Sequence, residues 1–334
     1  MAKADPSKLK KTKEIGSKDI LFSVALVPES ERLYVASSDF KVYEVDAAAD
    51  KPEFTPFEGD GHQSYVTSLV LSSGGVVSGS YDGQLIWWNP EDRKLVRKVP
   101  AHERWIRKLS VSPDGKTIAS VADDMVCKLW DAESGKEIRS FTDHKPETPH
   151  HYPSMLYAVA FSSDGNLLAT GDKVGHTAIW DPNTGEKVGE VESPVLYTWD
   201  ARQRRHSIGG IRSLAFSPDG KQLAVGGIGK IGNIDHLGGP SRVEIFEWES
   251  GKRLHEIEDD KLKGLVEQFT WHPKNEWLLA AGGDNGGFVT FYDPKTGKAI
   301  HQEKAPMHVH AAAFSPDFTK LYTVGHNKIA VWEL

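Results

Sequence analysis

The sequence contains a single cysteine, Cys127, so an internal disulfide framework is excluded. Packing must therefore hold the core together, and we expect a reducing compartment, the cytoplasm, in which Cys127 is a small buried side chain. No stretch approaches about 18 consecutive apolar residues, and no apolar segment of a secretory signal follows the lysines between Lys3 and Lys13. We therefore expect a protein that is neither secreted nor bound to a membrane.

Concentrated positive charge and the common catalytic motifs are also missing. The formal net charge is −7 with both signs mixed along the chain, which argues against duplex nucleic acid as the main ligand. The sequence has no P-loop, no His-Glu-x-x-His and no Gly-x-Ser-x-Gly. Gly227-x-Gly229-x-x-Gly232 matches the dinucleotide fingerprint by letter, yet it lies between two predicted strands rather than between a strand and a helix. No cofactor is therefore predicted.

A short turn motif recurs seven times along the chain. The segment 112–116, Ser-Pro-Asp-Gly-Lys, returns at 217–221, and weaker copies begin at 27, 72, 162, 272 and 315. Alternating apolar residues flank each copy, which predicts two strands joined by a tight turn. A third strand such as 126–131 and a fourth strand after a Gly-containing turn complete each repeat. Four antiparallel strands in each of seven repeats predict a seven-bladed β-propeller.

The third strands carry a family resemblance. Trp130-Asp131 and Trp180-Asp181 end two of them, and degenerate pairs such as Trp88-Asn89 end others, so the chain resembles the WD40-repeat family over nearly its whole length. We expect one all-β domain over 1–334, with an N-terminal closing strand within 1–15 that pairs with the last blade, because the chain ends on a third strand. The expected blades are about 16–60, 61–100, 101–143, 144–193, 194–260, 261–305 and 306–334.

Two repeats carry the same set of polar residues. The sets are His62, Ser78, Asp82 and Trp88, and His102, Ser120, Asp124 and Trp130. The resemblance implies a hydrogen-bonded scaffold, and repetition argues against a Ser-His-Asp catalytic site. In the next repeat we expect an incomplete set, because Val174 stands where the acid should be.

Three neighbouring repeats contain extra chain. Successive turn positions from 113 to 273 are 50, 55 and 55 residues apart, against 40 to 45 elsewhere. The excess falls in 145–153, 194–210 and 228–240, on loops that emerge on one face of a propeller, the top, over blades four and five. These aromatic, His and Arg residues predict a binding surface for an acidic or phosphorylated peptide, unless the loops are tolerated insertions or cover the channel. The candidate residues are His150, His151, Tyr152, Tyr197, Trp199, Arg202, Arg204, Arg205, Lys230 and His236.

The mouth of the central channel is a second candidate surface. Aligning the first strands places seven residues in one column: Phe22, Thr67, Arg107, Tyr157, Arg212, Glu267 and His310. The resemblance implies that peptide contacts come from this column and from residues just before the turn Asp. Some of these side chains are expected to form hydrogen bonds with one another across the channel axis instead of binding a ligand. The candidates here are Tyr81, Trp105, Arg107, Tyr157, Arg212 and His310.

Two functions from different classes remain open. The first is a non-enzymatic scaffold that presents its top face to a protein or short peptide. The alternative is a propeller enzyme, a metal-dependent lactonase or other hydrolase, which needs ligands that converge at the channel mouth. Glu267 and His310 are the only two residues in the sequence that begin such a ligand set. His150-His151 and His308-x-His310 offer imidazoles, but ordinary surface or hydrogen-bonded histidines are the default, so no metal site is predicted.

Overall fold

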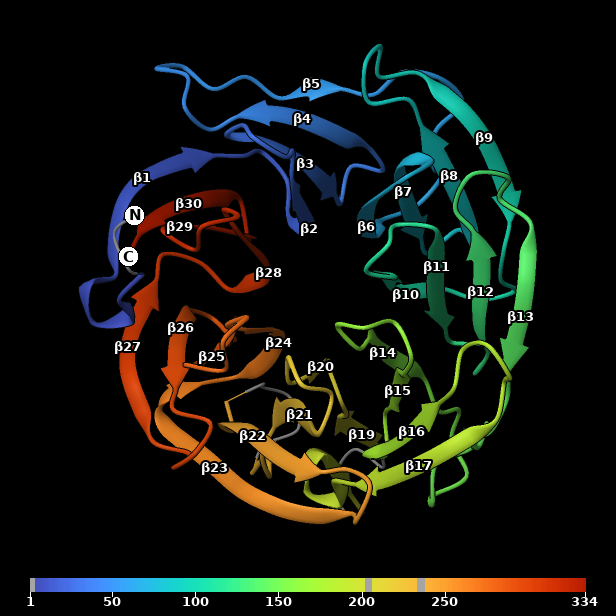
Figure 1. The fold of residues 1–334 in the computed structure, drawn as a ribbon, viewed down its shortest axis with the longest axis vertical. Coiled ribbons are helices and arrows are strands. Elements are labelled where there is room, and N and C mark those ends of the chain that lie inside the picture. Colours follow the sequence, from blue (N-terminus) through green and yellow to red (C-terminus); the bar gives the residue numbers. More distant parts are fainter. Residues whose placement is uncertain (1–3, 202–205, 233–237) are drawn as a thin grey trace.

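The computed structural model describes residues 4–201, 206–232 and 238–334, and within these ranges the chain forms seven four-stranded antiparallel sheets arranged in a ring (Figure 1). The predicted seven-bladed propeller is confirmed. Two short 3-10 helices, η1 (Pro6–Lys8) and η2 (Pro194–Leu196), are the helical segments of the described residues. None of the helices in this part of the chain is long and apolar enough to cross a membrane.

The first four blades follow one another along the chain, each with its strands in sequence order from the channel outward. Blade one consists of β2 (Leu21–Leu26), β3 (Arg32–Ser37), β4 (Val42–Asp46) and β5 (Thr55–Pro56). Blade two consists of β6 (Val66–Ser72), β7 (Gly75–Ser80), β8 (Gln84–Trp88) and β9 (Leu95–Pro100). Blade three consists of β10 (Ile106–Val111), β11 (Thr117–Ala122), β12 (Cys127–Asp131) and β13 (Glu137–Phe141). Blade four consists of β14 (Leu156–Phe161), β15 (Leu168–Asp172), β16 (His176–Trp180) and β17 (Lys187–Glu192).

The remaining blades include the inserted hairpin and the closing strand. A separate two-stranded sheet, β18 (Tyr197–Asp200) and β19 (His206–Gly209), precedes blade five. Blade five consists of β20 (Ser213–Phe216), β21 (Gln222–Ile228), β22 (Pro240–Glu247) and β23 (Lys252–Lys263). Blade six consists of β24 (Leu265–Trp271), β25 (Leu278–Gly283), β26 (Gly287–Tyr292) and β27 (Ala299–Ala305). Blade seven consists of β28 (Val309–Phe314), β29 (Lys320–Gly325), β30 (Lys328–Glu333) and, from the other end of the chain, β1 (Lys10–Gly16).

The recurring turn motif forms the bend between the first and second strands of a blade. In blade three the Ser112 hydroxyl lies 2.6 Å from an Asp114 carboxylate oxygen and accepts a hydrogen bond from the Thr117 amide at 2.9 Å. Gly115 has a φ of 75°, which glycine adopts without a steric penalty. The same Ser and Asp pair recurs at Ser162, Ser217 and Ser315. In these four blades, local hydrogen bonds of the motif thus fix the inner hairpin.

Apolar side chains fill the space between neighbouring blades. Seven buried clusters each combine residues of two adjacent blades, so every junction in the ring has its own core. Trp87 on β8, for example, is fully buried against Ile106 and Ile118 of the next blade. Each fully buried side chain of this size contributes about 1.5–3 kcal/mol.

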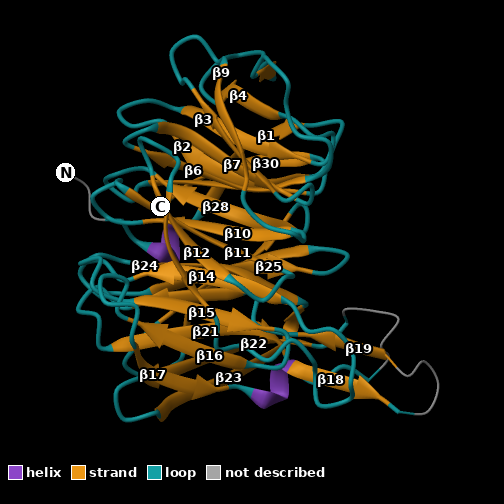
Figure 2. Ribbon diagram, turned by 90° about the vertical axis from the view of Figure 1, so that its right-hand side faces the viewer, coloured by secondary structure: helices purple, strands orange, loops and turns teal. Residues whose placement is uncertain are grey.

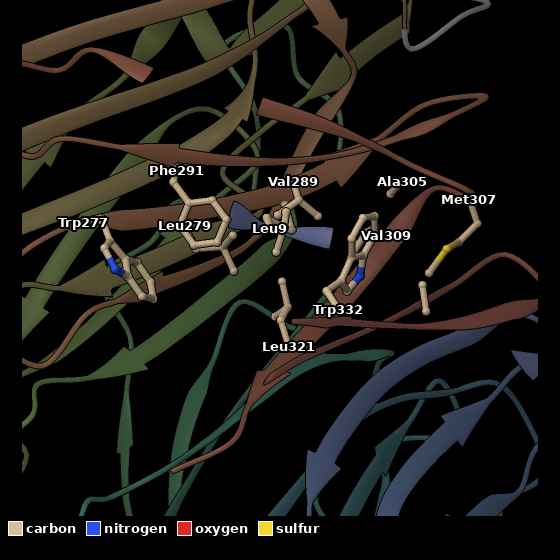
Figure 3. Close-up of a cluster of buried hydrophobic side chains, with 12 residues drawn as sticks. Leu9, Trp277, Leu279, Val289, Phe291, Ala305, Met307, Val309, Leu321 and Trp332 are labelled. Atoms are coloured by element: carbon tan, nitrogen blue, oxygen red, sulfur yellow. The ribbon is translucent and has the colours of Figure 1, made fainter. Parts of the chain in front are cut away.

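The ring closes through the N-terminal strand. β1 pairs antiparallel with β30, from Lys10 opposite Glu333 to Gly16 opposite Lys328. Just before β1, Leu9 enters the core between blades six and seven beside Val289 and Trp332 (Figure 3). The lysines of β1 are mostly exposed on the outer edge. The predicted closure by the N-terminus is confirmed.

The two complete polar sets form the expected networks. His62 lies 2.8 Å from the Ser78 hydroxyl and 3.1 Å from Asp82, and Trp88 donates to Ser78 at 2.8 Å. The second set, around His102, repeats this geometry. In both sets the histidine hydrogen bond and charge outweigh the effect of burial, and they lower the pKa of the Asp. Each network thus gives hydrogen-bond partners to buried polar side chains that come from a loop, a turn and two neighbouring strands.

The expected gap in blade four is wrong. His144 and Thr170 are 2.8 Å apart and Trp180 donates to Thr170 at 3.0 Å, as in the complete sets. The acid is Asp172, whose carboxylate lies 2.9 Å from the His144 ring. Asp172 is the last residue of the second strand, two residues before Val174 in the turn. Its side chain reaches the His144 ring from that position.

Replacing Asp172 with Ala tests this substitute acid. The change leaves His144 buried without its carboxylate, and we expect a loss of about 1–3 kcal/mol in the free energy of unfolding. Urea denaturation measures it, with the exposed Glu186→Ala as control. Equal stability of D172A and wild type would contradict the role assigned to Asp172.

Candidate ligand-binding face

Backbone bulges aim one side chain of each inner strand at the channel. In six blades the register with the second strand shifts across one residue, which is therefore the bulged position. In blade five the equivalent residue, Arg212, directly precedes β20. A bulge leaves one residue out of regular pairing and re-aims its side chain. The bulged residues are Phe22, Thr67, Arg107, Tyr157, Glu267 and His310.

These seven residues line one cavity of about 150 Å³, together with Tyr81 and Lys108. The alignment of first strands therefore places the channel-mouth column correctly. Lys108 was missed because regular alternation would turn it away from its neighbour Arg107. The bulge between Ile106 and Lys108 removes that alternation.

Arg107 is held at the centre of the mouth. Its guanidinium donates to both carboxylate oxygens of Asp123 at 2.7 Å and to the Tyr81 hydroxyl at 2.7 Å. It also lies 4.9 and 5.2 Å from the ring centres of Tyr81 and Trp105. Such a bidentate pair is rigid, so Arg107 presents an ordered charge. The expectation that some mouth residues satisfy one another applies to this group.

Further positive charge lines or borders the cavity. Arg212 lies over the Tyr157 ring at 3.8 Å, and its Nε is buried without a hydrogen-bond partner among the described residues. Burial lowers the pKa of Lys108. Burial and the neighbouring Arg212 and Arg107 lower the pKa of Lys173, which lies beside the mouth. Burial therefore disfavours the charged form of both lysines, and like charge adds to this effect only at Lys173; an anion would favour both cations.

Glu267 and two histidines occupy the blade six and seven side of the mouth. Burial opposes ionisation of Glu267, but His308 and Arg212 outweigh it and lower the pKa to about 2. Burial and the nearby His308 lower the pKa of His310 to about 3. Glu267 is thus a carboxylate and His310 a neutral imidazole at neutral pH.

An arc of aromatic rings borders the mouth over blades one to three. We call Phe40, Tyr65, Tyr81 and Trp105 the aromatic rim. Neighbouring ring centres are 5.9, 5.9 and 4.5 Å apart, and the last pair is stacked. Phe40, Tyr65 and Trp105 are 41%, 44% and 49% exposed. Phe40 lies in a loop between second and third strands and Tyr65 and Trp105 lie just before first strands, so all belong to the top face.

The three insertions pack on one another beside blades four and five. The Trp199 ring stacks on the His150 ring at a centroid distance of 4.2 Å, and its centre lies 5.3 Å from that of Tyr152. A hydrogen bond of 3.0 Å joins Nδ1 of His150 to the Tyr197 hydroxyl. The Ile231 amide donates to Thr198 at 3.2 Å, which joins the third insertion to the hairpin. Figure 2 shows β18 and β19 extending from one face of the ring.

The predicted insertion residues thus have different surroundings. Four of them form the aromatic cluster just described. His151 is exposed beside Glu147 at 3.6 Å, and Lys230 is exposed. The remaining calls, Arg202, Arg204, Arg205 and His236, lie outside the described residues.

The glycine motif at 227–232 has a packing role. It runs from β21 into the loop before β22, which is the strand-to-strand context expected for it. A Cβ on Gly227 would lie 2.5 Å from the Gly210 carbonyl oxygen. Gly227 therefore allows the backbones at the base of the insertions to approach closely.

Comparison with known proteins agrees with this architecture. The model of the WD domain, G-beta repeat, matches residues 54–89, 93–131, 135–181 and 201–230. The chain is a WD40-repeat β-propeller. Its sequence is similar to a guanine nucleotide-binding protein subunit beta of Oryza sativa, with 27% identity over 63% of this chain and 55% of the relative. The match to the eukaryotic translation initiation factor 3 subunit I of Candida albicans has 24% identity over 66% of this chain and 59% of that protein. The matched region thus spans little more than half of these relatives.

The packing of the insertions in this WD40 propeller can be tested by proteolysis. Trp199→Ala removes the stack on His150, and aromatic pairs of this kind contribute about 0.5–1.5 kcal/mol. We expect cleavage by trypsin after Lys230 and by a Glu-specific protease at Glu147 to become up to about tenfold faster. Trp105→Ala is the control and should leave both rates unchanged. Unaltered cleavage of W199A would show that the insertions do not depend on this contact.

Proposed function

We propose that this WD40 propeller is a non-enzymatic platform that binds a protein or short peptide through its top face. The aromatic rim is the observation that carries the proposal. Three large rings, those of Phe40, Tyr65 and Trp105, are about half exposed. Tyr81 joins Tyr65 to Trp105 and itself lines a cavity that can receive a side chain. Aromatic side chains beside an ordered arginine have the composition of interface hot spots.

The cavity chemistry favours an acidic partner. Arg107, Lys108, Lys173 and Arg212 lie in or beside the mouth, where Asp123 and Glu267 face them. The free Nε of Arg212 is a donor that a carboxylate or phosphate oxygen would satisfy. An acidic or phosphorylated side chain in the mouth, with neighbouring residues across the rim, fits both features.

The insertions over blades four and five supply a second wall for the partner in this proposal. Because His150, Tyr152, Tyr197 and Trp199 already pack on one another, the cluster acts as a preformed surface. Preformed surfaces bind with less loss of side-chain entropy than flexible loops. Two relatives are named as subunits, one of a guanine nucleotide-binding protein and one of eukaryotic translation initiation factor 3, and these names support a role in protein assemblies.

Tyr65→Ala with Trp105→Ala tests the rim. We expect at least about tenfold weaker binding of fluorescent Glu/Asp-rich peptides, with and without phosphoserine, and of the proteins that the wild type captures from lysate. The matched control is Ile138→Ala with Val188→Ala, two equally exposed apolar side chains on the outer strands β13 and β17. A second variant, Trp199→Ala with Arg205→Ala, tests the insertions. Equal binding by all of these chains would contradict the proposal, and selective binding of Lys-rich peptides would contradict the acidic partner.

Substitutions of Phe40 can separate its contribution to peptide binding from its effect on the stability of the fold. Its φ of 75° is in the left-handed region, where Gly83 and Gly175 stand in blades two and four. A side chain there costs about 1–2 kcal/mol. We expect Phe40→Gly and Phe40→Ala to weaken peptide binding equally, while F40G unfolds at higher urea than F40A. Full binding by F40G would remove Phe40 from the interface.

A further inference from the structure

Glu267, His308 and His310 form a group that the peptide-binding proposal does not use. We call it the Glu-His-His cluster. Each residue offers one ligand atom, and these atoms all lie within 4.8 Å of one another. The side chains of His308 and Glu267 are 5% and 19% exposed, and the His308 Nε2 lies 3.7 Å from a Glu267 oxygen. The cluster joins the first strands of blades six and seven at the channel mouth.

A backbone carbonyl orients the His308 ring. Nδ1 donates a hydrogen bond at 3.0 Å to the carbonyl oxygen of Asp284, which only accepts hydrogen bonds. Nε2, on the other side of the ring, lies 3.7 Å from a Glu267 carboxylate oxygen. A backbone carbonyl that orients the distal nitrogen of a histidine is a usual partner of a metal-binding imidazole.

Two imidazole nitrogens of the cluster are left unsatisfied. Nε2 of His308 and Nε2 of His310 are buried, and neither has a hydrogen-bond partner among the described residues. Buried polar atoms are nearly always paired, so two such atoms beside one carboxylate call for a missing partner.

A second cluster on the outside of blade four shows the contrast. Asp143, His176 and Glu190 also lie within 4.8 Å of one another. Lys187 already bonds Asp143 at 2.9 Å and Glu190 at 2.8 Å, and both nitrogens of His176 have carboxylate partners. An ammonium group thus bridges the carboxylates of that cluster. Among the residues that the structure describes, no lysine or arginine nitrogen forms a hydrogen bond with Glu267, although Arg212 and Lys108 lie nearby.

We propose that Glu267, His308 and His310 bind one divalent transition-metal ion at the channel mouth. Two imidazoles and one carboxylate suit Zn²⁺ and similar ions, and three protein ligands leave a position open toward the channel. Ca²⁺ and Mg²⁺ need more oxygen ligands than the cluster offers. Arg212 and Lys108 nearby further disfavour ions held by charge alone, so coordination by imidazole decides the selectivity.

Titration of the full chain, without a polyhistidine tag, with ZnCl₂ against a chromophoric chelator tests the site. We expect one equivalent of Zn²⁺ for the wild type, at least about tenfold weaker binding for Glu267→Gln, and loss of the site in His308→Gln with His310→Gln. CaCl₂ should not compete. Co²⁺ loading should give an absorption band in the wild type that the double variant lacks.

His176→Gln is the matched control, since it disrupts the second cluster. The H176Q chain should keep its equivalent of Zn²⁺ and its Co²⁺ band. Equal binding by wild type and by the folded H308Q/H310Q chain, or loss of binding in H176Q instead, would overturn the proposal. Thermal unfolding of each metal-free variant confirms that the fold is retained. Peptide binding by the rim is measured with a chelator present, so the two proposals fail separately.

Discussion

Packing between neighbouring blades is the interaction on which the rest of the molecule depends. Each blade buries one face against the blade before it and the other against the blade after it, so no blade has a complete core alone. The pairing of β1 with β30 completes the last blade, whose two faces belong to the clusters at both sides of the closure. Leu9 and Ile15 therefore tie the N-terminus into two junctions. The ring is stable only as a whole, because every junction needs both of its blades.

A closed ring fixes the mouth. The six bulged residues and Arg212 come from seven different blades, so their mutual distances are set by the ring. Arg107 shows the result: its partners Asp123 and Tyr81 lie on the loops of blades three and two, and both are held by the strands that precede them. Charge, aromatic surface and the Glu-His-His cluster are thus presented at fixed positions around one cavity. Preorganisation of this kind lowers the entropic cost of binding.

Much of this architecture could be predicted from the sequence, because the repeats encode it locally. Seven turn motifs set seven inner hairpins, and the missing fourth strand of the last blade required the N-terminus. The channel column followed from aligning equivalent positions. Asp172 could not be found in this way, since a carboxylate that reaches the ring from the strand end leaves no signal at the expected position. The mutual packing of His150, Tyr152 and Trp199 was equally hidden, because residues of different insertions meet only in three dimensions. The site residues of the peptide-binding proposal stay predictions.

The blades also differ in what they contribute. Blades two and three have regular polar networks and short connections, and yet their top loops carry most of the aromatic rim. Blades four and five carry the insertions, whose aromatic residues pack partly on one another. In this propeller, therefore, the longest insertions do not carry most of the exposed aromatic rings, since Phe40, Tyr65 and Trp105 lie on short loops and Tyr152 lies on an insertion.

The bulges have a consequence for how the molecule can vary. A residue at a bulge stands outside the regular pairing of its strand, and the bulge aims its side chain. Six such positions, together with Arg212 just before β20, face one cavity, each supported by a separate blade. Positions 22, 67, 107, 157, 212, 267 and 310 thus form a ready-made combinatorial set. A library randomised there would sample new combinations of charge and aromatic surface around one cavity, whose outline is set by the ring.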